Sequence, residues 1–278
     1  MGDVDFTEEQ IERYSRHILL PEVGVEGQLA FGSARILVVG AGGLGSPALL
    51  YLAAAGVGRL GVADGDVVEL SNLQRQIIHT TADLGRNKVV SAEETIRQIN
   101  PDCRVQAYPE RLTAENIRQV VREYDVVLDG CDNFPTRFLV SDCCRFEGIP
   151  LVSAAVLRFE GQLLTVLPGA GNPCYRCFLP EPPPPGLVPS CQQAGVLGVV
   201  VGVMGTLQAA EALKLVGGMG RPMSHELLLY DALTCRFRTV KRGLDPDCPL
   251  CGANQTITDL VEYDVSCAVD PDSPAGLG

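Results

Sequence analysis

Gly40, Gly42 and Gly45 are spaced Gly-x-Gly-x-x-Gly directly after the apolar run ILVV. A turn of this kind between a strand and a helix presents backbone N–H groups at the positive end of the helix, where phosphate groups bind. Asp64 ends the next apolar run, 19 residues after Gly45, where a carboxylate can accept a hydrogen bond from a ribose. The spacing predicts a nucleotide site and leaves a nicotinamide-dependent dehydrogenase open as an alternative.

Polar and charged residues crowd the segment DGDVVELSNLQRQ (64–76), which follows the second predicted strand. Ligands of open α/β sheets bind beyond the carboxyl ends of the strands, so a bound nucleotide is expected beside this segment. Arg75, and Lys88 on the helix that follows, could neutralise phosphate charge. A triphosphate carries more charge than a dinucleotide pyrophosphate and benefits more from cationic clamps. The two cations favour ATP, although each one taken singly is typical of a solvated surface.

Asp132 lies in LDGCDN (128–133), at the end of the fourth predicted strand. Its carboxylate would face the same crevice, and carboxylate and phosphate oxygens are the ligands that Mg²⁺ prefers. The alternative is that Asp132 is only the N-cap of the helix that starts near Pro135. Position alone does not separate the two interpretations.

Two Cys-x-x-Cys pairs, CYRC (174–177) and CPLC (248–251), have the spacing of a tetrahedral zinc site. We predict that Cys174, Cys177, Cys248 and Cys251 hold a structural zinc ion, with a redox-active pair as the main alternative. Cys191 is separate from both pairs, in a proline-rich segment, and is a candidate nucleophile. We expect the other cysteines to be buried small apolar residues, at positions 103, 131, 143, 144, 235 and 267.

Strand and helix patterns alternate along the first part of the chain. We expect helices over 44–55, 87–99, 114–122 and 135–147, and strands at 36–40, 59–64, 103–109, 125–129 and 150–156. This alternation is typical of an α/β fold with a doubly wound, mostly parallel, Rossmann-like sheet. The runs GQLLTVL (161–167) and HELLLYD (225–231) should extend the sheet with antiparallel strands, and EPPPPGLVPSCQQ (181–193) should cross the surface without regular structure.

We expect one compact domain made of four consecutive parts. These are a helical arm over 1–34, a nucleotide-binding half over 35–156, an antiparallel extension with the proline-rich crossover loop and the cysteine pairs over 157–252, and a polar tail over 253–278.

The net charge of −12 argues against a nucleic-acid binder. The apolar segment 194–216 carries Gln208, Glu211 and Lys214, so we interpret it as a buried helix rather than a membrane span. No secretory signal is visible at the N-terminus, and the eleven cysteines are an odd number. We therefore expect a reducing compartment, the cytoplasm.

The combination of VVGAGGLGSP, SNLQRQIIH, LDGCDNFPTR, CYRC, GVMGTLQAAEALK and CPLCG resembles the MoeB/ThiF group of sulfur-carrier-protein adenylyltransferases, which are relatives of the ubiquitin-activating enzymes. The resemblance runs from RYSRHILLPEVGVEGQ (13–28) to CPLCG (248–252). It implies that ATP sits on the glycine turn near Gly43 with Asp64 on the ribose. It also implies that the phosphates and Mg²⁺ are surrounded by Asp66, Ser71, Asn72, Arg75, Lys88, Asp132 and Asn133.

The reaction that this resemblance implies is adenylation of a small ubiquitin-like sulfur-carrier protein. The carboxylate of its C-terminal Gly-Gly would attack the α-phosphate of ATP, giving an acyl-adenylate and pyrophosphate, before thiocarboxylate formation for molybdopterin, thiamine or related routes. Arg16 matches an arginine that such enzymes insert into the neighbouring subunit's site, so a homodimer is expected.

Two features of the resemblance concern sulfur. Cys191 aligns with a crossover-loop cysteine that forms a thioester or persulfide link in some relatives and is dispensable in others. Certain relatives continue into a rhodanese domain, and this chain ends at Gly278, so a separate sulfurtransferase or persulfide donor is expected. Two alternatives stay open. The chain could activate another carboxylate or a tRNA base by the same chemistry, or it could be a non-catalytic zinc scaffold that binds a carrier protein.

Overall fold

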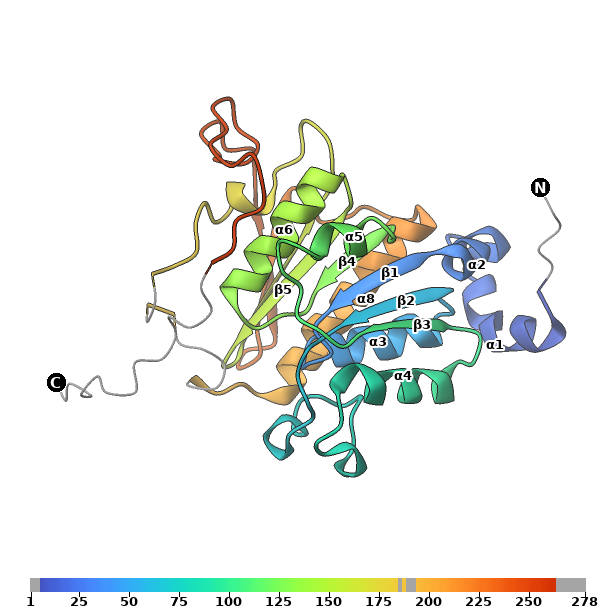
Figure 1. Cartoon of the computed structure of the whole chain (residues 1–278). Helices are drawn as coiled ribbons and strands as arrows, with labels where there is room; N and C mark the ends of the chain where they lie inside the picture. Colours follow the sequence, from blue (N-terminus) through green and yellow to red (C-terminus); the bar gives the residue numbers. More distant parts are fainter. Residues whose placement is uncertain (1–5, 185–186, 189–193, 264–278) are drawn as a thin grey trace.

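A computed structural model describes residues 6–184, 187–188 and 194–263. Its centre is an eight-stranded sheet in the order β3-β2-β1-β4-β5-β6-β7-β8 (Figure 1). The parallel strands are β1 (Arg35–Val39), β2 (Arg59–Ala63), β3 (Arg104–Tyr108), β4 (Val126–Asp129) and β5 (Leu151–Leu157). Antiparallel strands then extend it, namely β6 (Glu160–Val166), β7 (Glu226–Asp231) and β8 (Arg236–Lys241). The predicted α/β fold with a mostly parallel sheet and antiparallel additions is confirmed.

Helices cover both faces of the sheet. Ile36 and Val38 of β1 belong to the core shared with α3 (Gly45–Ala54), α4 (Lys88–Ile99) and α8 (Gly198–Gly217). Leu37 and Val39 belong to the core shared with α5 (Ile117–Val121) and α6 (Phe134–Glu147), which cover the opposite face (Figure 1). Successive side chains of a strand point to opposite faces, so a short, wholly apolar strand supplies both cores.

The sheet register brings three strand ends together. Val39, the last residue of β1, pairs with Ala63 at the end of β2 and with Asp129 at the end of β4. The turns that follow these three strands must therefore start side by side at one edge of the sheet. Candidate ligand-binding residues from three distant parts of the sequence are gathered there.

Helix α8 is long and apolar enough to cross a membrane by length and composition alone. It packs instead on α3, β5 and β6. Gln208 is buried and donates to the backbone oxygens of Asp129 and Val152, and Glu211 accepts a hydrogen bond from the Thr165 hydroxyl. These polar groups are satisfied inside the protein, which confirms the interpretation of α8 as a core helix.

Residues 6–34 contain α1 (Glu8–Ile18) and α2 (Gly24–Ser33), joined by a short turn. α1 packs on the rest of the chain through buried Tyr14, whose hydroxyl accepts a hydrogen bond from Asn100. Between β2 and α4 the chain forms two short 3₁₀ segments, η1 (Leu70–Asn72) and η2 (Thr81–Asp83), and a third, η3 (Tyr175–Cys177), lies within the first cysteine pair.

Three expectations from the sequence were wrong or incomplete. The helix expected over 114–122 is limited to Ile117–Val121, because Asn116 turns back to accept from the Thr113 amide. Strand β8 was not expected, because RFRTVK is exposed along its whole length and has no apolar face. Cys235, expected to be buried, is exposed in the β7–β8 turn with a positive φ of 51°. Cys267 lies outside the described residues.

Candidate active site

The glycine turn between β1 and α3 has little room for side chains. Gly40 has a φ of +96°, which favours glycine, and a Cβ there would lie 2.9 Å from the Gly130 oxygen. A Cβ on Gly45 would lie 1.9 Å from the Gly40 oxygen, and one on Gly43 would lie 2.7 Å from Val201 Cγ1. The absence of side chains at these positions lets the turns after β1 and β4 lie against each other and lets the glycine turn lie against α8.

Gly42 differs from the other three, because the nearest atom to an added Cβ is Gln76 Nε2 at 3.6 Å. No described residue therefore excludes a side chain at Gly42, whereas a ligand lying on the turn would. Gln76 is buried, and its Oε1 has no hydrogen-bond partner among the described residues. An open glycine and an unpaired amide oxygen side by side fit a polar ligand that rests on this turn.

Asp64, at the end of β2, lies directly against the turn. Its Oδ2 accepts from the Ala41 amide at 2.9 Å, and its Oδ1 accepts from the Asp66 amide at 2.9 Å. Burial raises the pKa of Asp64, and the nearby Lys88 ammonium opposes that rise. The carboxylate thus joins the first two turns of the site and keeps further lone pairs for a ligand hydroxyl.

Two of the predicted cations lie beside the same turn. Lys88 begins α4 with only 8% of its side chain exposed, and its Nζ is 3.2 Å from Oδ2 of Asp66. Arg75 is half-buried and donates to the Ser71 oxygen at 3.0 Å, and its Cγ lies 3.6 Å from the position of a Gly43 Cβ. The predicted Asn72 is buried in η1 and accepts from the Glu69 amide.

The turn after β4 corrects one interpretation of Asp132. Asn133, and not Asp132, is the N-cap of α6, accepting from the Thr136 amide at 2.9 Å. The N-cap alternative for Asp132 is therefore wrong. Asp132 is exposed and makes no hydrogen bond or ion pair within the part of the chain that the structure describes.

Arg16 is the one predicted cation that the chain does not bring to this edge. It is exposed on α1, a helix whose Arg13 donates to the Ile99 oxygen at the far end of α4 from Lys88. Twelve residues of α-helix separate those two ends, which corresponds to about 16 Å. Cys191 lies outside the described residues.

The four paired cysteines come together as predicted. Their sulfur atoms all lie within 4.8 Å of one another, with Cys174 to Cys248 at 3.5 Å and Cys177 to Cys251 at 3.3 Å. Zn–S bonds of about 2.3 Å in a tetrahedron place the sulfurs about 3.8 Å apart, which lies within the range of separations in this cluster, so the four sulfurs fit the ion after small shifts. Burial, and then the neighbouring thiols, raise the pKa of Cys174, which makes its thiolate unfavourable in the metal-free protein. A bound dication would stabilise that thiolate.

Comparison with known proteins now adds to this geometry. The model of the ThiF family matches residues 14–250 of the chain. The chain belongs to the ThiF family. It is 50% identical over 268 residues to a sulfur carrier protein adenylyltransferase of Thermus thermophilus, covering 95% of this chain and 99% of that one. It is 51% identical over 265 residues to a SAMP-activating enzyme E1 of Haloferax volcanii, covering 95% and 97%.

Solved structures are similar to this ThiF-family chain at the level of the fold. Crystalline E. coli MccB with MccA-N7isoASN superposes with a TM-score of 0.76 at 22% identity, covering 90% of this chain and 76% of that one.

The sequence did not identify the ion pair that supports the β4 turn of this ThiF-family chain. Asp129 is fully buried and accepts from Arg137 Nε at 2.9 Å, Ser153 Oγ at 2.7 Å and the Cys131 amide at 3.1 Å. Arg137 also donates to the oxygens of Cys131 and Ala154. The pair fixes the backbone that leads into Asp132.

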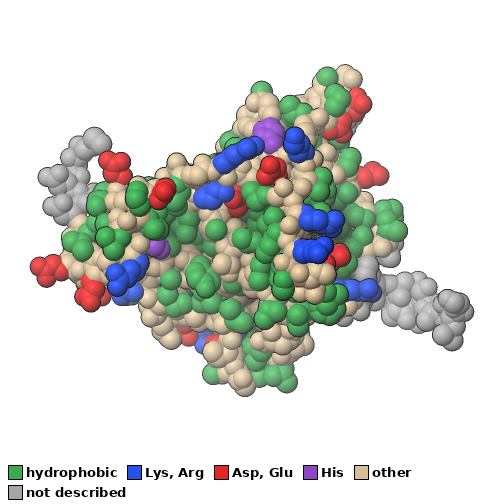
Figure 2. All heavy atoms as spheres, turned by 180° about the vertical axis from the view of Figure 1, so that it is seen from behind, with side chains coloured by type: hydrophobic (Ala, Val, Ile, Leu, Met, Phe, Trp, Pro, Cys, Tyr) green, Lys and Arg blue, Asp and Glu red, His purple; other side chains and the backbone are tan. Residues whose placement is uncertain are grey.

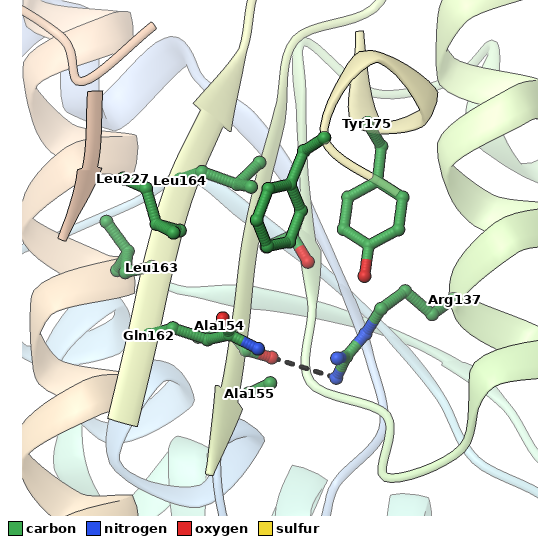
Figure 3. A pocket seen from close by; sticks show the side chains of 10 residues that line it. Arg137, Ala154, Ala155, Gln162, Leu163, Leu164, Tyr175 and Leu227 are labelled. Atoms are coloured by element: carbon green, nitrogen blue, oxygen red, sulfur yellow. Dashed lines mark hydrogen bonds between the residues drawn. The ribbon is translucent and has the colours of Figure 1, made fainter. Parts of the chain in front are cut away.

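A small pocket lies against Arg137, between β5, β6 and η3. In Figure 3 the Arg137 guanidinium and the Tyr175 hydroxyl point toward each other, with Gln162 and the leucines of β6 on the other side. Arg137, at the polar end of this pocket, already donates to Asp129 and to backbone oxygens. We therefore interpret the pocket as part of the support of the β4 turn and not as a separate site. Asp129 and Arg137 are eight residues apart, and no sequence pattern predicts an ion pair at that spacing.

Proposed function

We propose that this chain is an adenylyltransferase that transfers AMP from ATP to the C-terminal carboxylate of a small ubiquitin-like sulfur-carrier protein ending in Gly-Gly. The observation that carries the proposal is the convergence of an open glycine turn, Asp64, Arg75, Lys88 and the exposed Asp132 at three adjacent strand ends. The names of the two relatives, which match over nearly their full lengths, support the same reaction.

The reaction requires positioning and charge stabilisation rather than a strong base. A carboxylate oxygen of the carrier attacks the α-phosphorus, and the bond to the bridging oxygen of the β-phosphate breaks, so pyrophosphate leaves with the electron pair. Because the nucleophile is already ionised, no proton has to be removed. Arg75 and Lys88 would stabilise the charge that develops on the phosphates.

Asp132 is the residue that we propose holds Mg²⁺. It is exposed at the edge where the phosphates would lie and has no cationic partner within the described residues. Magnesium is usually bound through one or two carboxylates together with substrate phosphates, so Asp132 would supply a carboxylate ligand. Asp66 and Asn133 are already engaged, by Lys88 and by the cap of α6, whereas the Asp132 carboxylate has no such partner within the described residues.

ATP–pyrophosphate exchange tests the function. We expect exchange with ATP and Mg²⁺ only when a Gly-Gly carrier is present, and Asp132→Asn should reduce it by more than about 100-fold while leaving the melting temperature unchanged. Glu115→Gln, an equal change of charge at an exposed position, is the matched control and should retain full exchange. Absence of exchange with a series of Gly-Gly carriers would refute the proposal.

We further propose that the active form is a homodimer in which Arg16 completes the partner's site. Within one chain α1 lies away from the strand ends, so Arg16 could act only on another copy. Large apolar side chains are exposed on α1, α3, α4 and α8, among them Ile11, Tyr51, Val90 and Val199. Figure 2 shows hydrophobic side chains over the middle of the face behind the sheet, with charged groups toward its margins.

Subunit mixing tests the role of Arg16. Arg16→Ala and Asp132→Asn homodimers should both be inactive. After random reassociation, half of the dimers contain one intact composite site, so about a quarter of the wild-type exchange activity should return. No recovery would show that Arg16 acts within its own chain or not at all.

The remaining assignments concern zinc and sulfur. We propose that the four-cysteine cluster holds a structural zinc ion, and that the enzyme works in the cytoplasm with a separate sulfurtransferase or persulfide donor. Because adenylation needs no protein nucleophile, Cys191 would act only in a later step. Cys191→Ala should therefore leave ATP–pyrophosphate exchange unchanged.

A further inference from the structure

His79 is a buried histidine that contacts the glycine turn. The proposed adenylation reaction assigns no role to it. Only 5% of it is exposed. Its Nε2 lies 2.9 Å from the Ala41 oxygen, and its Nδ1 lies 2.8 Å from Ser91 Oγ. A carbonyl oxygen can only accept, so the ring hydrogen is on Nε2, and Nδ1 of the neutral ring accepts from the Ser91 hydroxyl. Burial lowers the pKa of His79, which keeps the ring neutral at physiological pH.

The bond to Ala41 controls the direction of a backbone amide in the turn. A trans peptide is planar, with its C=O and N–H pointing in opposite directions. The Ala41 oxygen and the Gly42 N–H belong to the same peptide unit, so His79 on one side fixes where the Gly42 N–H points on the other. Gly42 has no side chain to restrict its rotation, and its amide makes no hydrogen bond within the described residues.

The neighbouring peptide unit is held in the same manner by a different group. Asp64 accepts from the Ala41 amide, which fixes the Gly40–Ala41 unit. The two peptide planes that flank Ala41 are thus both fixed by side chains, one from the half-buried Asp64 and one from the buried His79. The Gly42 N–H is left as the donor at the start of α3, where a phosphate oxygen of the proposed substrate would lie.

The second nitrogen of the ring reaches another part of the site. Ser91 lies three residues after Lys88 on α4, so the two side chains share one side of that helix. His79 itself follows the segment that carries Ser71, Asn72 and Arg75. One imidazole therefore connects the glycine turn, the lysine helix and the arginine segment.

We infer that His79 is a positioning residue that aims the Gly42 amide at a phosphate of ATP and couples the glycine turn to the Lys88 helix. This inference rests on the proposed function, because it assigns His79 to the binding of the same ATP. The bond to Ala41 is the part that orients the phosphate donor. The hydrogen bond to Ser91 fixes the orientation of the imidazole ring.

Two amide substitutions separate these contacts. In His79→Gln the amide N–H₂ reaches the position of Nε2 and can still donate to the Ala41 oxygen. In His79→Asn the amide reaches only the position of Nδ1, so it keeps Ser91 and loses Ala41. The two variants are similar in polarity, and each can be checked for folding by its melting temperature.

ATP–pyrophosphate exchange with a Gly-Gly carrier, and direct titration with ATP and Mg²⁺, give the readout. We expect His79→Asn to raise the KM and the dissociation constant for ATP about tenfold, since one oriented hydrogen bond is lost. His79→Gln should stay within about threefold of wild type, and the KM for the carrier should stay unchanged in both. A purely structural role would lower kcat through loss of folded enzyme and leave both KM values unchanged.

Equal ATP affinity of the Asn and Gln variants overturns the inference, whether both bind like wild type or both are equally impaired. The proposed function fails separately, if the wild-type protein binds or exchanges no ATP with any carrier.

Discussion

The buried pair of Asp129 and Arg137 makes a strong prediction about stability. Neither side chain reaches solvent to any useful extent, with 0% of Asp129 and 7% of Arg137 exposed. Asp129→Asn keeps the size of the side chain and removes its charge. It leaves the Arg137 cation buried without a carboxylate partner, facing neutral groups such as the oxygens of Cys131 and Ala154.

The expected cost follows from that geometry. Breaking a buried ion pair by removing one partner costs about 3 to 5 kcal/mol, because the remaining charge stays desolvated without compensation. This is a large part of a total stability that is of the order of 5 to 15 kcal/mol. Removing both charges in Asp129→Asn/Arg137→Met leaves polar oxygens unpaired but no buried ion, so the double variant should lose less than the sum of the singles. We expect a coupling energy of about 2 kcal/mol or more.

Urea unfolding of the wild type, both single variants and the double variant measures the coupling. The midpoints should shift at constant m-value, so that the free energies of unfolding can be compared directly. ATP titration of the folded fraction adds a second readout, because the same pair supports the turn before Asp132. Single effects below about 1 kcal/mol, or strictly additive effects, would refute the assignment of this pair as a buried, mutually dependent ion pair.

Three further predictions concern other parts of the site and fold. Gly42→Ala should keep the wild-type melting temperature and weaken ATP binding, whereas Gly43→Ala should lose about 1 to 3 kcal/mol of stability through its clash with Val201, as measured by urea unfolding. Chelation at the four-cysteine cluster should release zinc, detected with a metal indicator, and lower the melting temperature; a metal-free protein with unchanged stability argues against a structural ion. The hydrogen bond and charge of Arg122 hold the pKa of Glu147 below its usual value of 4.5, so this stabilisation is present above that pH and is lost as the pH falls through the folded-state pKa. Glu147→Gln should therefore flatten the fall of melting temperature between about pH 5 and pH 3.

Local patterns account for the parts of this structure that the sequence could predict. ILVVG and DVVLD are short apolar runs bounded by turn residues, and each became a parallel strand buried on both faces. The two Cys-x-x-Cys pairs are about seventy residues apart and still predicted one cluster, because metal chemistry demands four ligands wherever they lie in the chain. The strands can be predicted from a short stretch of residues, and the cysteine cluster can be predicted from the number of ligands that zinc requires.

The features that were missed depend on neighbours that only the folded chain brings together. β8 has no apolar face, and its backbone hydrogen bonds to β7 place it in the sheet. Asn133 rather than Asp132 caps α6 because the turn after β4 is set by the Asp129–Arg137 pair, which places Asn133 one residue before the helix. The Arg137 side chain, for example, binds backbone oxygens of Cys131 and Ala154, which lie six and seventeen residues away in the sequence. Sequence motifs therefore predicted groups that lie together at the strand ends, and the residues that hold this part of the backbone became visible only through their contacts.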